Sequence, residues 1–170
     1  MKYIYLLIMS LFFFSCTDSK INSPKSDEDL TRNMLMDAKI YAHSVETINI
    51  PLMVEYTLPI YIRMNGGKDV YTRSLENSAH PIDEIEFMKI EILPKSGIIK
   101  GDNNKYYSVV EQKIEQKLKG IETPVYSDIN LVAESQDGGL NWKFGFLRRA
   151  DTEHFYTFDL AEEINKHLDF

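Results

Sequence analysis

Apolar residues recur at spacings of three and four along residues 29–46, which is the pattern of an amphipathic helix. The positions that share this face are Leu30, Met34, Ala38, Tyr41, Ala42 and Val45. Just before them, residues 26–29 (SDED) supply a capping serine and carboxylates, which the positive N-terminus of a helix attracts. The pattern therefore predicts a first helix over roughly residues 29–46.

Shorter helices are predicted next. Residues 52–64 are mostly apolar, and Pro59 among them removes a helical hydrogen bond, so we expect short or kinked helices there. Gly66 and Gly67 are suited to end these helices as a C-cap. Residues 68–78 predict a third short helix. Its inward-facing side chains should be Val70, Tyr71 and Leu75.

The second half of the chain changes to a period of two, which is typical of β-strands. Alternation predicts strands over residues 86–94, 128–135 and 141–147, and Trp142, Phe144 and Phe146 should share one face of the last. An Asp-Gly-Gly turn at 137–139 joins the last two strands, since Asp-Gly suits the positive φ of hairpin turns. Residues 106–118 fit both a helix and a long strand, and the neighbouring turns and strands favour the strand.

A terminal helix is predicted over residues 158–168, where Leu160, Ile164 and Leu168 align. Helices first and an antiparallel meander after them are typical of the α+β class. The folded part, residues 30–170, has no internal repeat or second linker, so it is expected to form one domain.

Residues 1–16 differ from the rest of the chain in being mostly apolar and in containing the single cysteine. A lysine at position 2 is followed by a mostly apolar run over residues 3–14, and Ser15 and Cys16 come next. The run is too short to span a membrane and has the plan of a secretory signal peptide over residues 1–15. It resembles a bacterial lipoprotein signal, in which the cysteine is acylated and becomes the new N-terminus. An ordinary signal peptide with a chance cysteine, or an uncleaved anchor, is the alternative.

The lipoprotein resemblance implies that Cys16 anchors the protein to a membrane of the bacterial cell envelope through its acyl chains, with the outer membrane favoured. Residues 16–29 are rich in Ser, Asn, Pro and charged residues, and such a segment buries too little surface to order itself. We therefore expect a flexible tether that holds the domain away from the membrane.

Composition narrows the classes of function. The 170 residues carry 19 Lys and Arg against 26 Asp and Glu, a net charge of −7, which argues against a nucleic-acid partner. The single cysteine excludes an intramolecular disulfide and a cysteine-built metal site. The four histidines are scattered and show no ligand spacing, and no phosphate-binding or dinucleotide-binding glycine motif occurs. No catalytic residue, metal or cofactor is therefore assigned.

Two local motifs resemble those of small bacterial lipoproteins with a nuclear transport factor 2-like fold, a cystatin-like cone. Residues 56–59 (YTLP) with residues 64–68 (MNGGK) match one motif, and residues 134–144 (ESQDGGLNWKF) match a hairpin motif. The resemblance covers roughly residues 30–148 and implies helices packed on a strongly curved sheet around a pocket. The C-terminal helix is extra to this plan. The resemblance implies no reaction, because this fold serves enzymes and binding domains alike.

If the inner face of the sheet lines a pocket, polar groups on it would contact a ligand. The candidate pocket-lining residues are Tyr56, Tyr61, Tyr106, Gln112 and Gln116. We expect a non-catalytic domain that binds a small apolar ligand or an envelope protein. The alternatives are an isomerase- or dehydratase-type enzyme in the cone, and a structural lipoprotein that forms a homodimer through its sheet.

Overall fold

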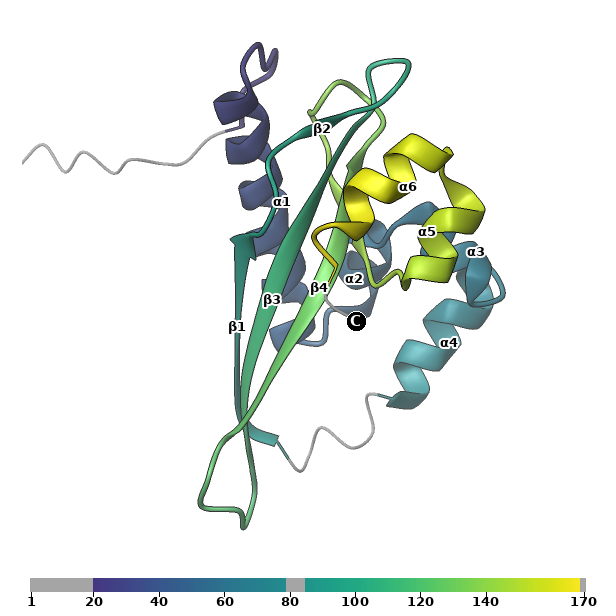
Figure 1. Cartoon of the computed structure of the whole chain (residues 1–170). Coiled ribbons are helices and arrows are strands. Elements are labelled where there is room, and N and C mark those ends of the chain that lie inside the picture. The colour runs from purple at the N-terminus through teal and green to yellow at the C-terminus, as the bar shows by residue number, and fades with distance from the viewer. Residues whose placement is uncertain (1–19, 79–84, 169–170) are drawn as a thin grey trace, which may run out of the picture.

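The computed structural model describes residues 20–78 and 85–168. Four helices come first in the described chain, in the order α1 (Asp27–Glu46), α2 (Ile50–Tyr56), α3 (Pro59–Met64) and α4 (Lys68–Ser78). The strands follow as β1 (Ile85–Pro94), β2 (Ile99–Lys100), β3 (Tyr106–Leu118), β4 (Val125–Ser135) and β5 (Lys143–Gly145). Helices α5 (Arg149–Phe155) and α6 (Phe158–Asn165) end the described chain (Figure 1). The fold is α+β, as expected.

Local chemistry explains where the first helices begin. The Ser26 side chain accepts a hydrogen bond from the Asp29 N–H, and the Asp29 carboxylate accepts one from the Ser26 N–H, which is a capping box. Pro59 stands at the first position of α3, where its missing N–H costs nothing, so it starts a helix rather than kinking one. Gly66 and Gly67 both have positive φ after α3, which confirms the predicted helix stop.

The strands form an antiparallel sheet in the order β1-β3-β4-β5, and β2 pairs with the start of β3. The long β3 has a partner on each side, with Ile114 opposite Ile90 of β1 and Val110 opposite Leu131 of β4. This two-sided pairing explains why residues 106–118 form a strand although their spacing also fits a helix.

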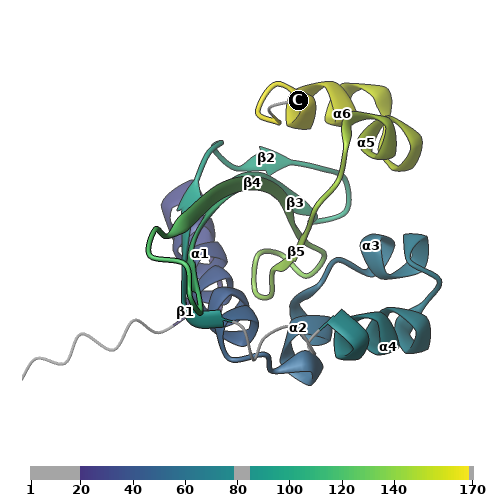
Figure 2. The ribbon, with the colours of Figure 1, turned by 90° about the horizontal axis from the view of Figure 1, so that it is seen from below.

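The sheet is curved, and α1 lies along its inner face while α5 and α6 lie outside it (Figure 2). The inner core contains Leu30, Met34, Ala38, Val110, Leu131, Ala133, Trp142 and Phe144. A second core on the outer face contains Leu58, Tyr107, Val109, Val132, Leu147, Ile164 and Leu168. Alternate residues of β3 and β4 therefore face two different hydrophobic layers.

The structure corrects several expectations. Residues 20–29, predicted as tether, pack on the domain or begin α1. Helix α5 was not predicted. Val70, predicted to face inward, is 46% exposed and lies beside Gly66. Phe146, predicted to share a face with Trp142 and Phe144, is 47% exposed, and β5 ends one residue before it. Among the described residues, no helix is long and apolar enough to cross a membrane.

Candidate functional site

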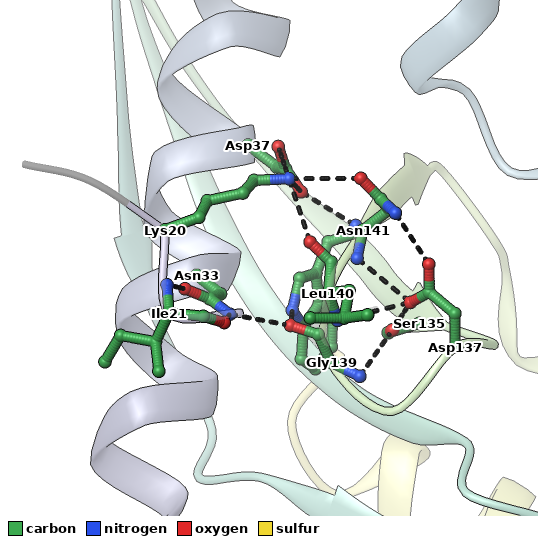
Figure 3. A network of polar contacts seen from close by, with 10 residues as sticks. Lys20, Ile21, Asn33, Asp37, Ser135, Asp137, Gly139, Leu140 and Asn141 are labelled. Carbon is green, nitrogen blue, oxygen red and sulfur yellow. Dashed lines mark hydrogen bonds and ion pairs between the residues drawn. The ribbon is translucent and has the colours of Figure 1, made fainter. Parts of the chain in front are cut away.

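The N-terminal strap, which we define as residues 20–26, is fixed to the domain by an ion pair between a partly exposed lysine and a buried carboxylate (Figure 3). The Lys20 Nζ lies 2.7 Å from Asp37 Oδ1 and 2.8 Å from Oδ2. It also donates to the carbonyl of Leu140 at 2.9 Å. The Asp37 side chain is 0% exposed, and its Oδ2 accepts the backbone N–H of Trp142 at 2.8 Å. One carboxylate on α1 thus joins the strap to the β4–β5 connection.

A buried asparagine reinforces this attachment one turn earlier on α1. The Ile21 N–H donates to Asn33 Oδ1 at 2.7 Å, and the Asn33 amide donates to the carbonyls of Ile21 at 2.8 Å and Gly139 at 3.0 Å. Gly139 has a φ of +84°, and a Cβ there would clash with the Leu30 side chain of α1. Only glycine therefore fits where the β4–β5 connection packs against α1.

The turn that receives the strap is organised by Asp137. Its carboxylate accepts hydrogen bonds from the Ser135 hydroxyl at 2.8 Å, the Asn141 N–H at 2.9 Å and the Asn141 amide at 2.6 Å. Burial raises the pKa of Asp137, but the hydrogen bonds, those from Asn141 first, outweigh it and hold the pKa below its usual 3.8.

Acid should weaken this turn. Because the pKa of Asp137 is lower in the folded chain than in the unfolded one, its ionised form stabilises the fold fully above pH 3.8, and that stabilisation is lost as the pH falls through the folded pKa. We expect Asp137→Asn to cost on the order of 1 kcal/mol at pH 6, and the difference from the unmodified chain to shrink below about pH 4. Urea unfolding across this pH range measures it. Asp128→Asn, at an exposed position, is the control, and a gap that stays constant with pH would contradict the assignment.

A cleft of about 800 Å³ lies on the outer face of the sheet. Its walls come from α3, the β2–β3 turn, the ends of β3 and β4 that meet there, and the α5–α6 segment. Apolar side chains such as Ile60, Phe155 and Leu160 alternate around it with charged ones. The cleft therefore combines apolar surface with polar groups, as ligand sites usually do.

Glu134 is the buried carboxylate of this cleft, only 6% exposed. It accepts hydrogen bonds from the Gln136 amide at 2.6 Å and from the Tyr156 hydroxyl at 3.2 Å. The Tyr156 ring packs edge-to-face against Tyr107 with 5.4 Å between ring centroids. Burial first, and then the negative charge of Glu134, raise the pKa of Tyr156 far above its ordinary value and that of Tyr107 to about 12. Both phenols therefore stay protonated and neutral at physiological pH.

The residues predicted to line a pocket lie elsewhere. Tyr106, Gln112 and Gln116 belong to the inner face of β3, and Gln112 is buried between Ile92 and Ile129. None of these three residues lines the cleft, which opens on the opposite face.

The two other candidates lie on the short helices. The ring of Tyr56 has Lys143 Nζ 4.8 Å from its centroid, and burial, followed by the charge of Asp37, raises its pKa to about 12. The ring of Tyr61 packs edge-to-face on Tyr71. Neither lines the cleft, so a pocket-lining role for either stays a prediction.

Sequence reasoning missed the two buried carboxylates. Asp37 lies on the apolar side of α1, one turn after Asn33 and next to Ala38. A carboxylate at such a position indicates a buried, paired charge, and this is how the sequence could have revealed it. Glu134 alternates with the apolar residues of β4, a pattern that predicts a side chain facing water, and this prediction is wrong because the α5–α6 segment covers Glu134. Cys16 lies outside the described residues. Within the described part of the chain, no cluster of three His, Cys, Asp or Glu has a metal-site arrangement.

No protein-family model matches the chain, and no curated protein matches it. A conserved protein from Planctomyces limnophilus, known from its crystal structure, is similar with a TM-score of 0.46 at 8% identity. The match covers 69% of this chain and 90% of that one. A likeness at this level carries no argument about function.

Proposed function

We propose that this protein is a lipid-anchored component of the bacterial cell envelope whose domain binds a ligand without catalysis. The cleft around Glu134 supports the binding role, because a buried carboxylate with two protonated tyrosines beside it forms a polar centre between apolar walls. On the inner face of the sheet, where the resemblance implies a pocket, Trp142 and Phe144 are both 0% exposed, which favours the cleft on the outer face as the binding site.

An acid–base enzyme is the second candidate, and the same pair favours it, since a carboxylate and a phenol are able to accept and donate protons. Glu134 and Tyr156 are hydrogen-bonded to each other, and the pKa of each cleft tyrosine is raised. Such phenols serve more readily as fixed hydrogen-bond donors than as proton carriers at neutral pH, which places the binding role first.

The proposed anchor implies a short connection to the membrane. The strap is bonded to the domain from Lys20 onward, so the chain between Cys16 and Lys20 reaches at most roughly 14 Å when fully extended. The domain would therefore be held close to the lipid headgroups, in contrast to the distance that a tether over residues 16–29 would allow.

Cys16→Ser tests the anchor. We expect this variant to lose all incorporation of radiolabelled palmitate and to leave the membrane fraction, because serine offers no thiol for acylation. A cysteine placed back at Ser15 in the same variant is the matched control, since it restores a thiol one residue out of place and should not restore labelling. Unchanged labelling and fractionation of Cys16→Ser would contradict the lipoprotein assignment.

Native mass spectrometry of the full chain, extracted from membranes in detergent, tests the cleft. We expect a bound molecule that Thr157→Trp displaces, because position 157 is exposed, lines the cleft and makes no side-chain capping bond. Ser74→Trp, at an exposed position on α4, is the matched control and should keep the adduct. An adduct that persists in Thr157→Trp would contradict the proposed site.

A further inference from the structure

Among the described residues, the carboxylate in the cleft forms no ion pair, although Lys143 stands opposite Glu134 in the β4–β5 pairing. The Lys143 ammonium lies over the ring of Tyr56 instead, 4.8 Å from its centroid. The donors that bind Glu134, the Gln136 amide and the Tyr156 hydroxyl, are both neutral. Removing an ionised carboxylate from water costs several kcal/mol unless a cation or enough hydrogen bonds replace the lost solvation. Glu134 faces an open cleft, so a positively charged ligand that enters the cleft is able to pair with its carboxylate.

The carboxylate has capacity left for such a ligand. Its Oε1 accepts from Gln136 and its Oε2 from Tyr156, and each carboxylate oxygen has about two acceptor positions. Each oxygen of Glu134 thus retains one position. A primary ammonium or a guanidinium group carries several N–H donors and a full positive charge, which suits both free positions at once.

The surroundings favour the same chemistry. Tyr107 and Tyr156 stay neutral, and the face of an aromatic ring attracts a cation within about 6 Å. The basic residues of the cleft, Arg63, Lys100 and Lys105, are accompanied by further carboxylates, so the walls do not carry an excess of positive charge. Lys100 is also paired with Asp27 at 3.4 Å.

We propose that the cleft recognises a cationic ligand, an ammonium or guanidinium group carried on an apolar body, with Glu134 as its counter-ion. This inference rests on the proposed binding function of the cleft and names its ligand class. The apolar body would contact Ile60, Phe155 and Leu160, which line the same cleft.

Isothermal titration of the full chain in a neutral detergent tests this with three probes of matched shape: 2-phenylethylamine, 2-phenylethanol and 3-phenylpropionate. We expect the amine to bind at least about 10-fold more tightly than the alcohol, and the carboxylate to bind most weakly. Glu134→Gln should lower the affinity for the amine roughly 10- to 100-fold and leave that for the alcohol unchanged, since a hydrogen bond to a charged group contributes about that much.

Glu122→Gln is the matched control, because Glu122 is an exposed carboxylate in the β3–β4 turn, outside the cleft. It should change the affinity for the amine less than about 3-fold. The probe comparison on the unmodified chain keeps the test valid even if Glu134→Gln fails to fold. Equal affinity for amine and alcohol, or equal loss in the two variants, overturns the cationic ligand and leaves the cleft as a binding site. No binding of any probe overturns both proposals.

Discussion

Replacing Asp37 by alanine is expected to lower the free energy of unfolding by about 3 kcal/mol, the lower end of what breaking a buried ion pair costs, because Lys20 is itself partly exposed. The carboxylate is 0% exposed, holds Lys20 Nζ at 2.7 Å and accepts the Trp142 N–H. The variant loses the ion pair and leaves a buried N–H without its acceptor. Urea unfolding followed by the fluorescence of the single tryptophan measures the loss.

Two variants separate the causes. Asp37→Asn keeps an oxygen that is able to accept from Trp142 and removes only the charge, so its loss should be smaller than that of Asp37→Ala. Asp69→Ala, at an exposed position on α4, should change the free energy of unfolding by no more than about 0.5 kcal/mol. If Asp37→Ala costs as little as Asp69→Ala, the pair of Lys20 and Asp37 does not hold the strap.

Trp142→Ala is expected to cost about 3–5 kcal/mol, through the cavity it leaves in the inner core. The side chain is 0% exposed, packs in the cluster with Met34 and Phe144, and donates from Nε1 to the carbonyl of Gly139 at 3.3 Å. Because the variant lacks the single tryptophan, its unfolding is followed by far-ultraviolet circular dichroism.

Trp142→Phe distinguishes volume from hydrogen bonding, since it keeps an aromatic ring and loses the Nε1–H. Its loss should be clearly smaller than that of Trp142→Ala. Tyr126→Ala removes a ring that is 68% exposed near the β3–β4 turn and should have little effect. If Trp142→Phe and Trp142→Ala lower the free energy of unfolding equally, the loss comes from the hydrogen bond to Gly139 and not from the cavity left in the core.

The elements that the sequence predicted well are those whose pattern is local. The apolar stripe of α1, the proline at position 59 and the alternation of β4 each depend on residues within one or two turns, so they could be recognised without knowing the fold. The strand at 106–118 was harder, because its apolar residues fit a helix too, and only pairing with β1 and β4 decides between them.

The candidate site depended on contacts that no local pattern contains. The partner of Asp37 is a lysine 17 residues upstream, in a segment whose composition is typical of a linker. The alternation of Glu134 with apolar residues predicts a side chain facing water, and no local pattern shows that the outer face of β4 is covered. The unpredicted α5, together with α6, supplies that cover, so missing one short helix also meant missing the cleft.

The strap also sets an order of events during synthesis. Lys20 bonds to a carbonyl 120 residues later, and Asp37 to an N–H 105 residues later. A ribosome releases α1 long before these partners are made, so the carboxylate of Asp37 stays in water until nearly the whole domain has emerged. Contacts between residues this far apart in the sequence also form slowly, because closing the long loop between them costs entropy before the contact contributes any stabilisation. Newly made chains are therefore able to bury this carboxylate, and to fix the N-terminus to the domain, only after residues 140–142 have been made.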